Sequence, residues 1–180
     1  TFPPQGQRTR LACPPGSSDS LLLAGLADGR RLLILTQSAQ DAARLLDEMR
    51  WFNPARQVAL LPDWETLPYD PLSPHPDIVS ERLSTLARLP VAQRGVLLVA
   101  AETLLQRLPP RDYIQGRSFS LKTGQRFALD AVRAQLTQAG YYGVAQVSAP
   151  GEYALRGSLF DVFPMGTEQP LRIDLFDDEI

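Results

Sequence analysis

The sequence lacks several residue types on which metal, redox and membrane proteins depend. Its 180 residues include one cysteine, Cys13, and one histidine, His75. A single cysteine excludes an intrachain disulfide and favours a reducing compartment, so we expect a cytoplasmic protein. A zinc site made of cysteine and histidine would lack ligands, and we expect no metal site. No apolar run approaches about 18 residues, so we expect no membrane span.

Lysine is almost absent, and this bears on nucleotide chemistry. Lys122 is the only lysine. A phosphate-binding loop of an ATPase needs a Gly-rich turn that ends in Gly-Lys-Ser/Thr, because backbone amides hold the phosphates and the lysine reaches the terminal ones. The one candidate, "PPGSSDS" at residues 14–20, has no lysine. We therefore expect no catalytic residues, no cofactor and no enzymatic activity in this chain.

The charge balance argues against a chain whose main task is to bind nucleic acid. The formal net charge is −2 and the pI is about 5.4, whereas non-specific nucleic-acid binding usually needs a concentrated basic face. His75 stands between prolines in "SPHPD" and is interpreted as a loop residue, and Cys13 is interpreted as inert because no cation stands beside it.

A proline-rich segment, "DWETLPYDPLSPHPD", mixes acidic and aromatic residues. Asp63, Glu65 and Asp70 could form a carboxylate cluster, but nothing else in the sequence makes such a cluster a reaction site. The alternative that we favour is a loop whose Trp64 and Tyr69 pack onto a sheet.

Hydrophobic periodicity in the first part of the chain predicts alternating strands and helices. "RLLILT" and "GVLLVA" are short apolar runs of the kind found in strands buried on both faces, and "RQVALLP" predicts a third strand. Between them, "SAQDAARLLDEMRWF" predicts an amphipathic helix capped by Ser38, and "IVSERLSTLARL" predicts another with Val79, Leu83 and Leu86 on one face. This alternation is typical of a parallel α/β sheet, which we expect over residues 1–115.

The pattern changes in residues 116–180, where we expect a small α+β domain. A helix over "ALDAVRAQLTQAGY" should end at Gly140, and strands are predicted at "GVAQVSA", "YALRGSLFDVFP" and "LRIDLFDD".

Side-chain alternation in the last strand predicts an unusual surface. It separates a core-facing set, Leu171, Ile173 and Leu175, from a solvent-facing set, Arg172, Asp174 and Phe176. In the preceding strand, Arg156 stands before Gly157, whose missing side chain would let something approach the backbone. An exposed phenylalanine beside arginines has the composition of an interface anchor. A solvated face with weak ion pairs, such as Arg172–Asp174, explains the pattern equally well.

Four stretches carry a family resemblance: "DWETLPYDPLSPHPDIVSERLSTL", "KTGQRFALDAVRAQLTQAGY", "GEYALRGSLFDVFPMG" and "LRIDLFDDEI". They resemble the N-terminal, UvrB-homology region of the bacterial transcription-repair coupling factors, the Mfd family, from about Arg31 onward. The resemblance implies a helicase-like domain with a degenerate phosphate loop of the P-loop NTPase type, followed by a UvrB-like domain that binds UvrA. The family's UvrA-contacting residues fall on Arg156, Arg172 and Phe176.

The resemblance thus implies a non-catalytic adaptor fragment that recruits the nucleotide-excision-repair protein UvrA to stalled RNA polymerase. The parent protein's contacts with RNA polymerase, DNA and ATP would belong to domains absent here. Two alternatives stay open at this point: an ATP-dependent helicase-type domain with an unusual nucleotide loop, and a domain that binds DNA directly.

Overall fold

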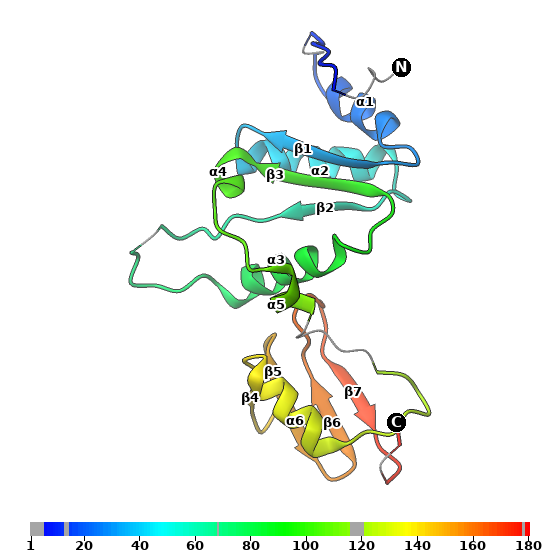
Figure 1. The fold of residues 1–180 in the computed structure, drawn as a ribbon, viewed down its shortest axis with the longest axis vertical. Coiled ribbons are helices and arrows are strands. Elements are labelled where there is room, and N and C mark those ends of the chain that lie inside the picture. Colours follow the sequence, from blue (N-terminus) through cyan, green and yellow to red (C-terminus); the bar gives the residue numbers. More distant parts are fainter. Residues whose placement is uncertain (1–5, 13–14, 68, 116–120, 178) are drawn as a thin grey trace.

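The structure, a computed structural model, describes residues 6–12, 15–67, 69–115, 121–177 and 179–180. Its strands form a three-stranded sheet and a four-stranded sheet, which lie at opposite ends of the molecule (Figure 1). Cys13 lies outside the described residues. Among the helices that are described, none has the length and apolar character needed to cross a membrane.

The first part of the chain is a mixed α/β unit with a parallel sheet, as predicted. Its elements are α1 (Ser18–Leu26), β1 (Arg31–Thr36), α2 (Ala39–Phe52), β2 (Val58–Leu61), α3 (Pro76–Arg88), β3 (Gly95–Ala100) and α4 (Ala101–Leu104). The strand order is β1-β3-β2, and both pairings are parallel. Each strand is therefore joined to the next by a crossover that contains a helix.

Helix α2 begins where the sequence predicts. The Ser38 hydroxyl accepts the backbone N–H of Asp41 at 3.1 Å and donates to the Asp41 carboxylate at 2.9 Å. A cap of this kind satisfies one of the unpaired N–H groups of the first turn. The helix then buries Ala42, Leu45 and Met49 at helical spacing against the sheet.

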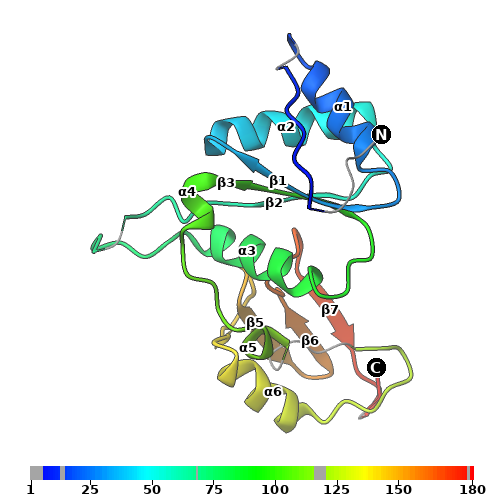
Figure 2. The same cartoon turned by 45° about the horizontal axis from the view of Figure 1, so that its top comes forward.

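The two faces of the parallel sheet are covered unequally. Helix α2 lies on one face and α3 on the other (Figure 2), but α3 contacts β2 and leaves β1 open on its side. Leu33 and Leu35 of β1 are consequently 59% and 54% exposed. The expectation that "RLLILT" is buried on both faces is wrong, because β1 is an edge strand; the central strand β3 is buried as expected.

Helix α3 buries a different face from the one that its leucines predict. Val79, Leu83 and Leu86 are only half-buried, and the most buried residues are Ser80, Arg82 and Thr85. The polar side chains find partners: the Thr85 hydroxyl donates to the Leu60 carbonyl at 3.2 Å, and the Arg82 guanidinium donates to the Pro62 carbonyl and lies 4.1 Å from the centre of the Trp64 ring. Hydrogen bonding thus offsets the cost of burying Thr85, whereas the Nε and Nη2 atoms of Arg82 are buried without a hydrogen-bond partner among the described residues.

The second part of the chain is built on the four-stranded sheet. Helix α5 (Arg111–Gln115) precedes it and contacts α3 of the first part, and the elements of the second part are α6 (Leu129–Gln138), β4 (Tyr142–Gly143), β5 (Glu152–Arg156), β6 (Leu159–Val162) and β7 (Leu171–Asp174). The strand order is β4-β5-β6-β7; β4 is parallel to β5, and the other neighbours are antiparallel. Gly140 follows α6 with φ +88°, as expected for a residue that ends a helix.

Two strands are shorter than the sequence predicts. "GVAQVSA" does not form a strand beyond β4, because the Glu152 carboxylate accepts the backbone N–H groups of Ser148 and Ala149 at 2.7 and 2.9 Å and folds this segment into a turn. β7 ends at Asp174, and Leu171, which was expected in the core, is 51% exposed at its start.

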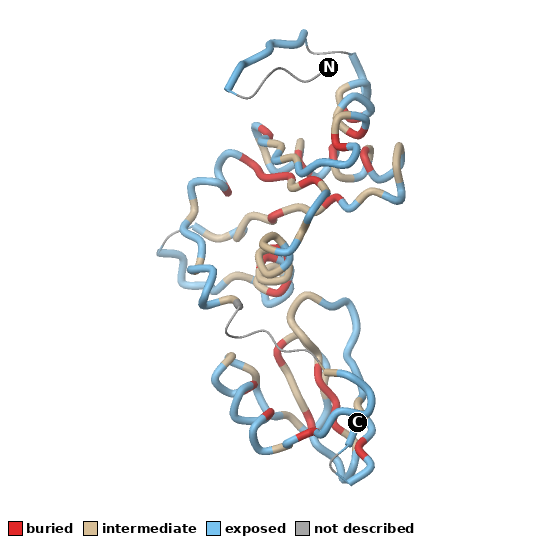
Figure 3. The backbone as a smooth tube through the Cα atoms, turned by 45° about the vertical axis from the view of Figure 1, so that its right-hand side comes forward, coloured by how far each residue is buried: buried red, intermediate tan, exposed pale blue. Residues whose placement is uncertain are grey.

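The core of this unit lies between α6 and one face of the sheet. It comprises Phe127, Val132, Leu136, Phe160, Val162 and Leu175. The ring of Phe160 lies 5.2 Å from that of Phe127 and 6.0 Å from that of Tyr153. Figure 3 shows that the buried positions lie along strands and helices, whereas the connecting segments are mostly exposed or intermediate.

The loop between β6 and β7 contacts helix α3 of the first part. The backbone N–H of Gly166 donates to the Ser80 hydroxyl at 2.5 Å. Gly166 has φ +84°, and a Cβ atom at this position would overlap the Ser84 side chain. Only glycine fits here. Through its hydrogen bond to Ser80, this residue couples the two parts of the chain.

Candidate functional site

The face of the second sheet that points away from α6 depends on a hairpin that the sequence does not predict. "YALRGSLFDVFP" was expected to be one strand, but it folds into β5, a two-residue turn at Gly157 and Ser158, and β6. Gly157 has φ +60°, at the turn position that a type II′ hairpin reserves for glycine. Its missing side chain therefore serves the turn.

The hairpin and β7 bring Arg156, Asp161 and Arg172 together on this face. Asp161 lies on the central strand β6, directly opposite Arg172 of β7 and Ala154 of β5. Arg156 is two positions beyond Ala154 and lies diagonally across from Asp161. Neighbouring strands are about 5 Å apart, so both guanidinium groups can reach the same carboxylate.

Both arginines bind Asp161 rather than Asp174. Arg172 holds the carboxylate with two donors, Nε to Oδ1 at 2.7 Å and Nη2 to Oδ2 at 3.0 Å, and Arg156 donates from Nη2 to Oδ2 at 2.6 Å. These bonds, first those from Arg172 and then that from Arg156, lower the pKa of Asp161 from 3.8 to about 2. The carboxylate is therefore ionised throughout the neutral range, and the ion pair suggested between Arg172 and Asp174 is not the one formed.

In this arrangement the Asp161 carboxylate is buried and the two guanidinium groups are exposed. The Asp161 side chain is 10% exposed, whereas the side chains of Arg156 and Arg172 are 51% and 58% exposed. Each guanidinium uses only part of its fork of N–H donors on Asp161, and the remaining donors face solvent. Such groups can bind carboxylates of another molecule.

Phe176 emerges at the same end of the sheet as Arg156. Arg156 pairs with Leu159, which pairs with Asp174, and the backbone N–H of Leu175 donates to the Ser158 carbonyl at 2.9 Å. The Leu175 side chain enters the core, and the next residue, Phe176, is 85% exposed. The backbone of Phe176 is held by two hydrogen bonds with Glu179, of 2.9 and 3.0 Å, so the ring stands on a tight turn instead of in a strand.

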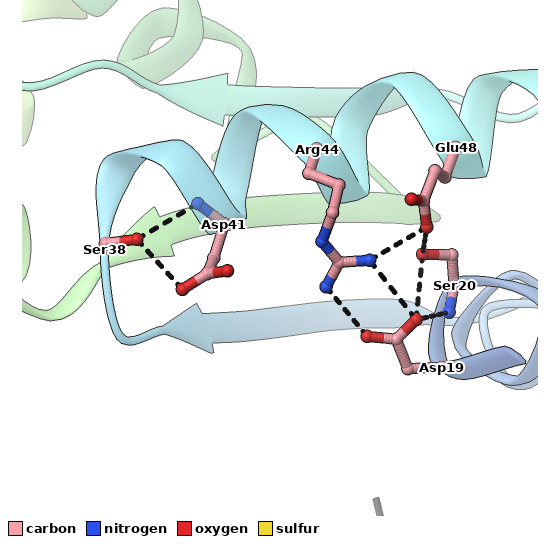
Figure 4. A network of polar contacts seen from close by, with 6 residues as sticks. All are labelled: Asp19, Ser20, Ser38, Asp41, Arg44 and Glu48. Atoms are coloured by element: carbon pink, nitrogen blue, oxygen red, sulfur yellow. Dashed lines mark hydrogen bonds and ion pairs between the residues drawn. The ribbon is translucent and has the colours of Figure 1, made fainter. Parts of the chain in front are cut away.

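The one candidate for a phosphate-binding loop has carboxylates beside it. The lysine-free "PPGSSDS" runs into the first turn of α1 and contributes Asp19 to it, and the Ser20 hydroxyl donates to Glu48 of α2 at 2.5 Å (Figure 4). Arg44 bridges both acids at 2.9 Å. The pKa of Asp19 is lowered chiefly by Arg44, and that of Glu48 by Ser20. Asp19 at this helix end and Glu48 on α2 together carry one more negative charge than Arg44 neutralises, which opposes the binding of phosphate here.

The acidic residues of the proline-rich segment do not form a cluster. The Asp63 carboxylate accepts hydrogen bonds from Thr103 at 3.0 Å and Gln106 at 2.6 Å, which is a structural role, and Asp70 accepts the Leu67 N–H at 2.7 Å. Within the described ranges, no group of three or more acidic, histidine or cysteine residues could hold a metal ion.

Of the aromatic residues in this segment, Trp64 packs beneath Arg82, but Tyr69 is fully exposed, so the expectation that both pack onto the sheet is wrong for Tyr69. His75 precedes α3, where its Nδ1 accepts the Asp77 N–H at 3.3 Å and caps the helix.

Sequence reasoning missed Asp161, although a signal was present. Before Gly157 the core-facing residues have odd numbers, Tyr153 and Leu155, and after it they have even numbers, Phe160 and Val162. A change of phase in the alternation marks a two-residue turn. With that turn placed, the hairpin register would have set Asp161 diagonally across from Arg156, whereas its pairing with Arg172 depends on the separate register of β7.

Comparison with known proteins gives a family match and several similar relatives. Residues 119–180 match the UvrB interaction domain. The chain is 48% identical to the transcription-repair-coupling factor of Escherichia coli over 97% of its own length, and 44% identical to that of Haemophilus influenzae over 92%. It is 27% identical to that of Bacillus subtilis over 94%. It spans only about 15% of the length of these relatives.

Proposed function

This chain is related over nearly its whole length to the N-terminal region of the transcription-repair-coupling factors, and on that basis we propose that it is a non-catalytic adaptor. It binds the nucleotide-excision-repair protein UvrA and so recruits it to stalled RNA polymerase in transcription-coupled repair. Its place of action is the cytoplasm. Contacts with RNA polymerase, DNA and ATP belong to parts of the longer protein outside these 180 residues.

The observation that carries this proposal is the surface formed by Arg156, Arg172 and Phe176. It lies within the segment that matches the UvrB interaction domain, and it presents two half-exposed guanidinium groups and an exposed phenylalanine. Arginines and aromatic residues dominate the energetics of protein interfaces. In the proposed complex, the arginines donate hydrogen bonds to carboxylates of UvrA, and the phenyl ring fills an apolar pocket.

A pull-down with purified UvrA tests the proposal. The variant R172A/F176A should retain little UvrA, because the loss of an interface arginine or aromatic anchor typically costs about 2–4 kcal/mol of binding. The matched control is R133A/Y142A, which removes an exposed arginine of α6 and an exposed aromatic residue of β4 from the same unit. Equal retention of UvrA by the R172A/F176A variant and the unmodified chain would reject the proposed surface.

We further propose that residues 1–115 form a helicase-like domain with a degenerate phosphate site, and that residues 116–180 form a separate UvrA-binding domain. The degenerate phosphate site is supported by two carboxylates, that of Asp19 in the first turn of α1 and that of Glu48 on the neighbouring helix α2. Calorimetry with ATP at millimolar concentration should give no binding heat. A clear binding isotherm would instead favour an ATP-dependent domain with an unusual nucleotide loop.

A further inference from the structure

Asp161 is less accessible to a docking partner than the two arginines that surround it. Its side chain is 10% exposed, while the two arginines bound to it are 51% and 58% exposed. It lies on β6, between the strands that carry the two arginines. Any effect of Asp161 on a bound partner therefore passes through Arg156 and Arg172.

The bonds to Asp161 restrain both arginines, and Arg172 more fully than Arg156. Arg172 approaches through Nε and Nη2 together, at 2.7 and 3.0 Å, which sets the plane of its guanidinium group as well as its position. Arg156 shares the oxygen Oδ2 at 2.6 Å. Three donors on two oxygen atoms occupy most of the acceptor capacity of the carboxylate.

We propose that Asp161 is the positioning residue of the docking surface: it holds Arg156 and Arg172 in one orientation so that their remaining N–H donors are ready for carboxylates of the partner. This inference rests on the proposed function. A free arginine loses much side-chain entropy when it is fixed in an interface. Because Asp161 fixes both side chains before the partner arrives, the side-chain entropy is lost when the chain folds and not when the partner binds.

Asp174 provides the matched comparison. It lies on the same strand as Arg172, two positions away and on the same face of the sheet. It is exposed, and within the described part of the chain no ion pair joins it to either arginine. Asp161 thus binds the two arginines and Asp174 does not, while replacing either aspartate by asparagine changes the net charge by the same amount.

The test is calorimetric titration of UvrA with D161N and D174N variants of the 180-residue chain. We expect D161N, which keeps the shape of the side chain but loses its charge, to bind roughly tenfold more weakly, and D174N to bind like the unmodified chain. In an R156A/R172A background, D161N should cause no further loss, because a positioning residue acts only through the groups it positions. An unchanged affinity of D161N, or an equal loss in both backgrounds, would overturn the inference.

The outcomes separate this inference from the proposed function. If R156A/R172A binds UvrA as well as the unmodified chain, the docking surface itself is wrong. If R156A/R172A weakens binding but D161N does not, only the role of Asp161 is wrong. Thermal unfolding shows whether D161N is folded; if it is not, D161E takes its place, since it keeps the charge and displaces the carboxylate by one methylene. An effect of D161E that persists without both arginines would contradict the proposal.

Discussion

Asp161 keeps its negative charge in acid because two guanidinium groups hold it, and its pKa falls from 3.8 to about 2. The folded-state pKa lies below that of the unfolded chain, so Asp161 stabilises the fold fully above about pH 4. This contribution is lost as the pH falls toward 2. It amounts to at most about 2 kcal/mol, and solvent reduces it because both arginines are half exposed.

We therefore predict that D161N is less stable than the unmodified chain at neutral pH, and that the difference in unfolding free energy shrinks as the pH is lowered from about 4. Urea denaturation of both proteins between pH 3 and pH 7 measures it. A difference that stays constant across this range would mean that Asp161 contributes through its shape instead of its charge.

Residues such as Asp161 mark the limit of what the sequence reveals. Alternation alone assigned Arg172 to the exposed face, and the structure agrees. A buried carboxylate, however, is recognised only from its cross-strand partners, and these depend on the register. The register depends on the hairpin turn at Gly157, and the apolar pattern had predicted a continuous strand there.

At the scale of elements, the β5–β6 hairpin determines which side chains face outward. Gly157 has φ +60°, and a Cβ atom there would meet nothing within 4 Å. The cost of a side chain at this position is therefore conformational and not steric. For an L-residue in the left-handed region it is about 1–2 kcal/mol, and asparagine tolerates the region better than alanine.

The prediction is that G157A lowers the unfolding free energy by about 1 kcal/mol and that G157N lowers it less. Chemical denaturation at neutral pH is the appropriate measurement. Equal stability of G157A and the unmodified chain would show that the hairpin turn does not require a positive φ at this residue.

The regular elements of the first part were predicted well, for identifiable reasons. β1, α2 and β3 each combine a clear period with a clear boundary, such as the Ser38 cap of α2. The burial of Ser80, Arg82 and Thr85 in α3 was not predictable, because their partners lie on distant segments. Arg82 and Thr85 bind backbone carbonyls, and Arg82 also lies over an aromatic ring. Ser80 accepts a backbone N–H from the loop after β6. Similarly, the exposure of Leu33 and Leu35 depends on what covers β1 and not on the strand itself.

At the scale of the whole molecule, Gly166 joins the two parts of the chain. Its backbone N–H donates to Ser80 at 2.5 Å, and the neighbouring N–H of Met165 donates to the Tyr141 hydroxyl at 2.9 Å. Burial raises the pKa of Tyr141, so its hydroxyl remains protonated at neutral pH. The loop between β6 and β7 is thereby held against α3 from one side and against the second unit from the other.

We predict that G166A destabilises the protein more than G140A does. Both glycines have a positive φ, +84° and +88°, so both substitutions incur backbone strain. Only at Gly166 would the new Cβ also overlap Ser84, whereas at Gly140 it would meet nothing within 4 Å. Thermal unfolding of the two variants isolates the contact between the parts. Equal losses of stability would indicate that the contact with α3 contributes nothing.

The most direct test of the central claim is the dissociation constant of UvrA for this 180-residue chain, measured by isothermal titration calorimetry with and without the three surface side chains. We expect the R156A/R172A/F176A variant to bind at least about thirtyfold more weakly, which corresponds to about 2 kcal/mol. The R133A/Y142A control should bind like the unmodified chain. An unchanged dissociation constant in the triple variant would contradict the claim that this surface docks UvrA.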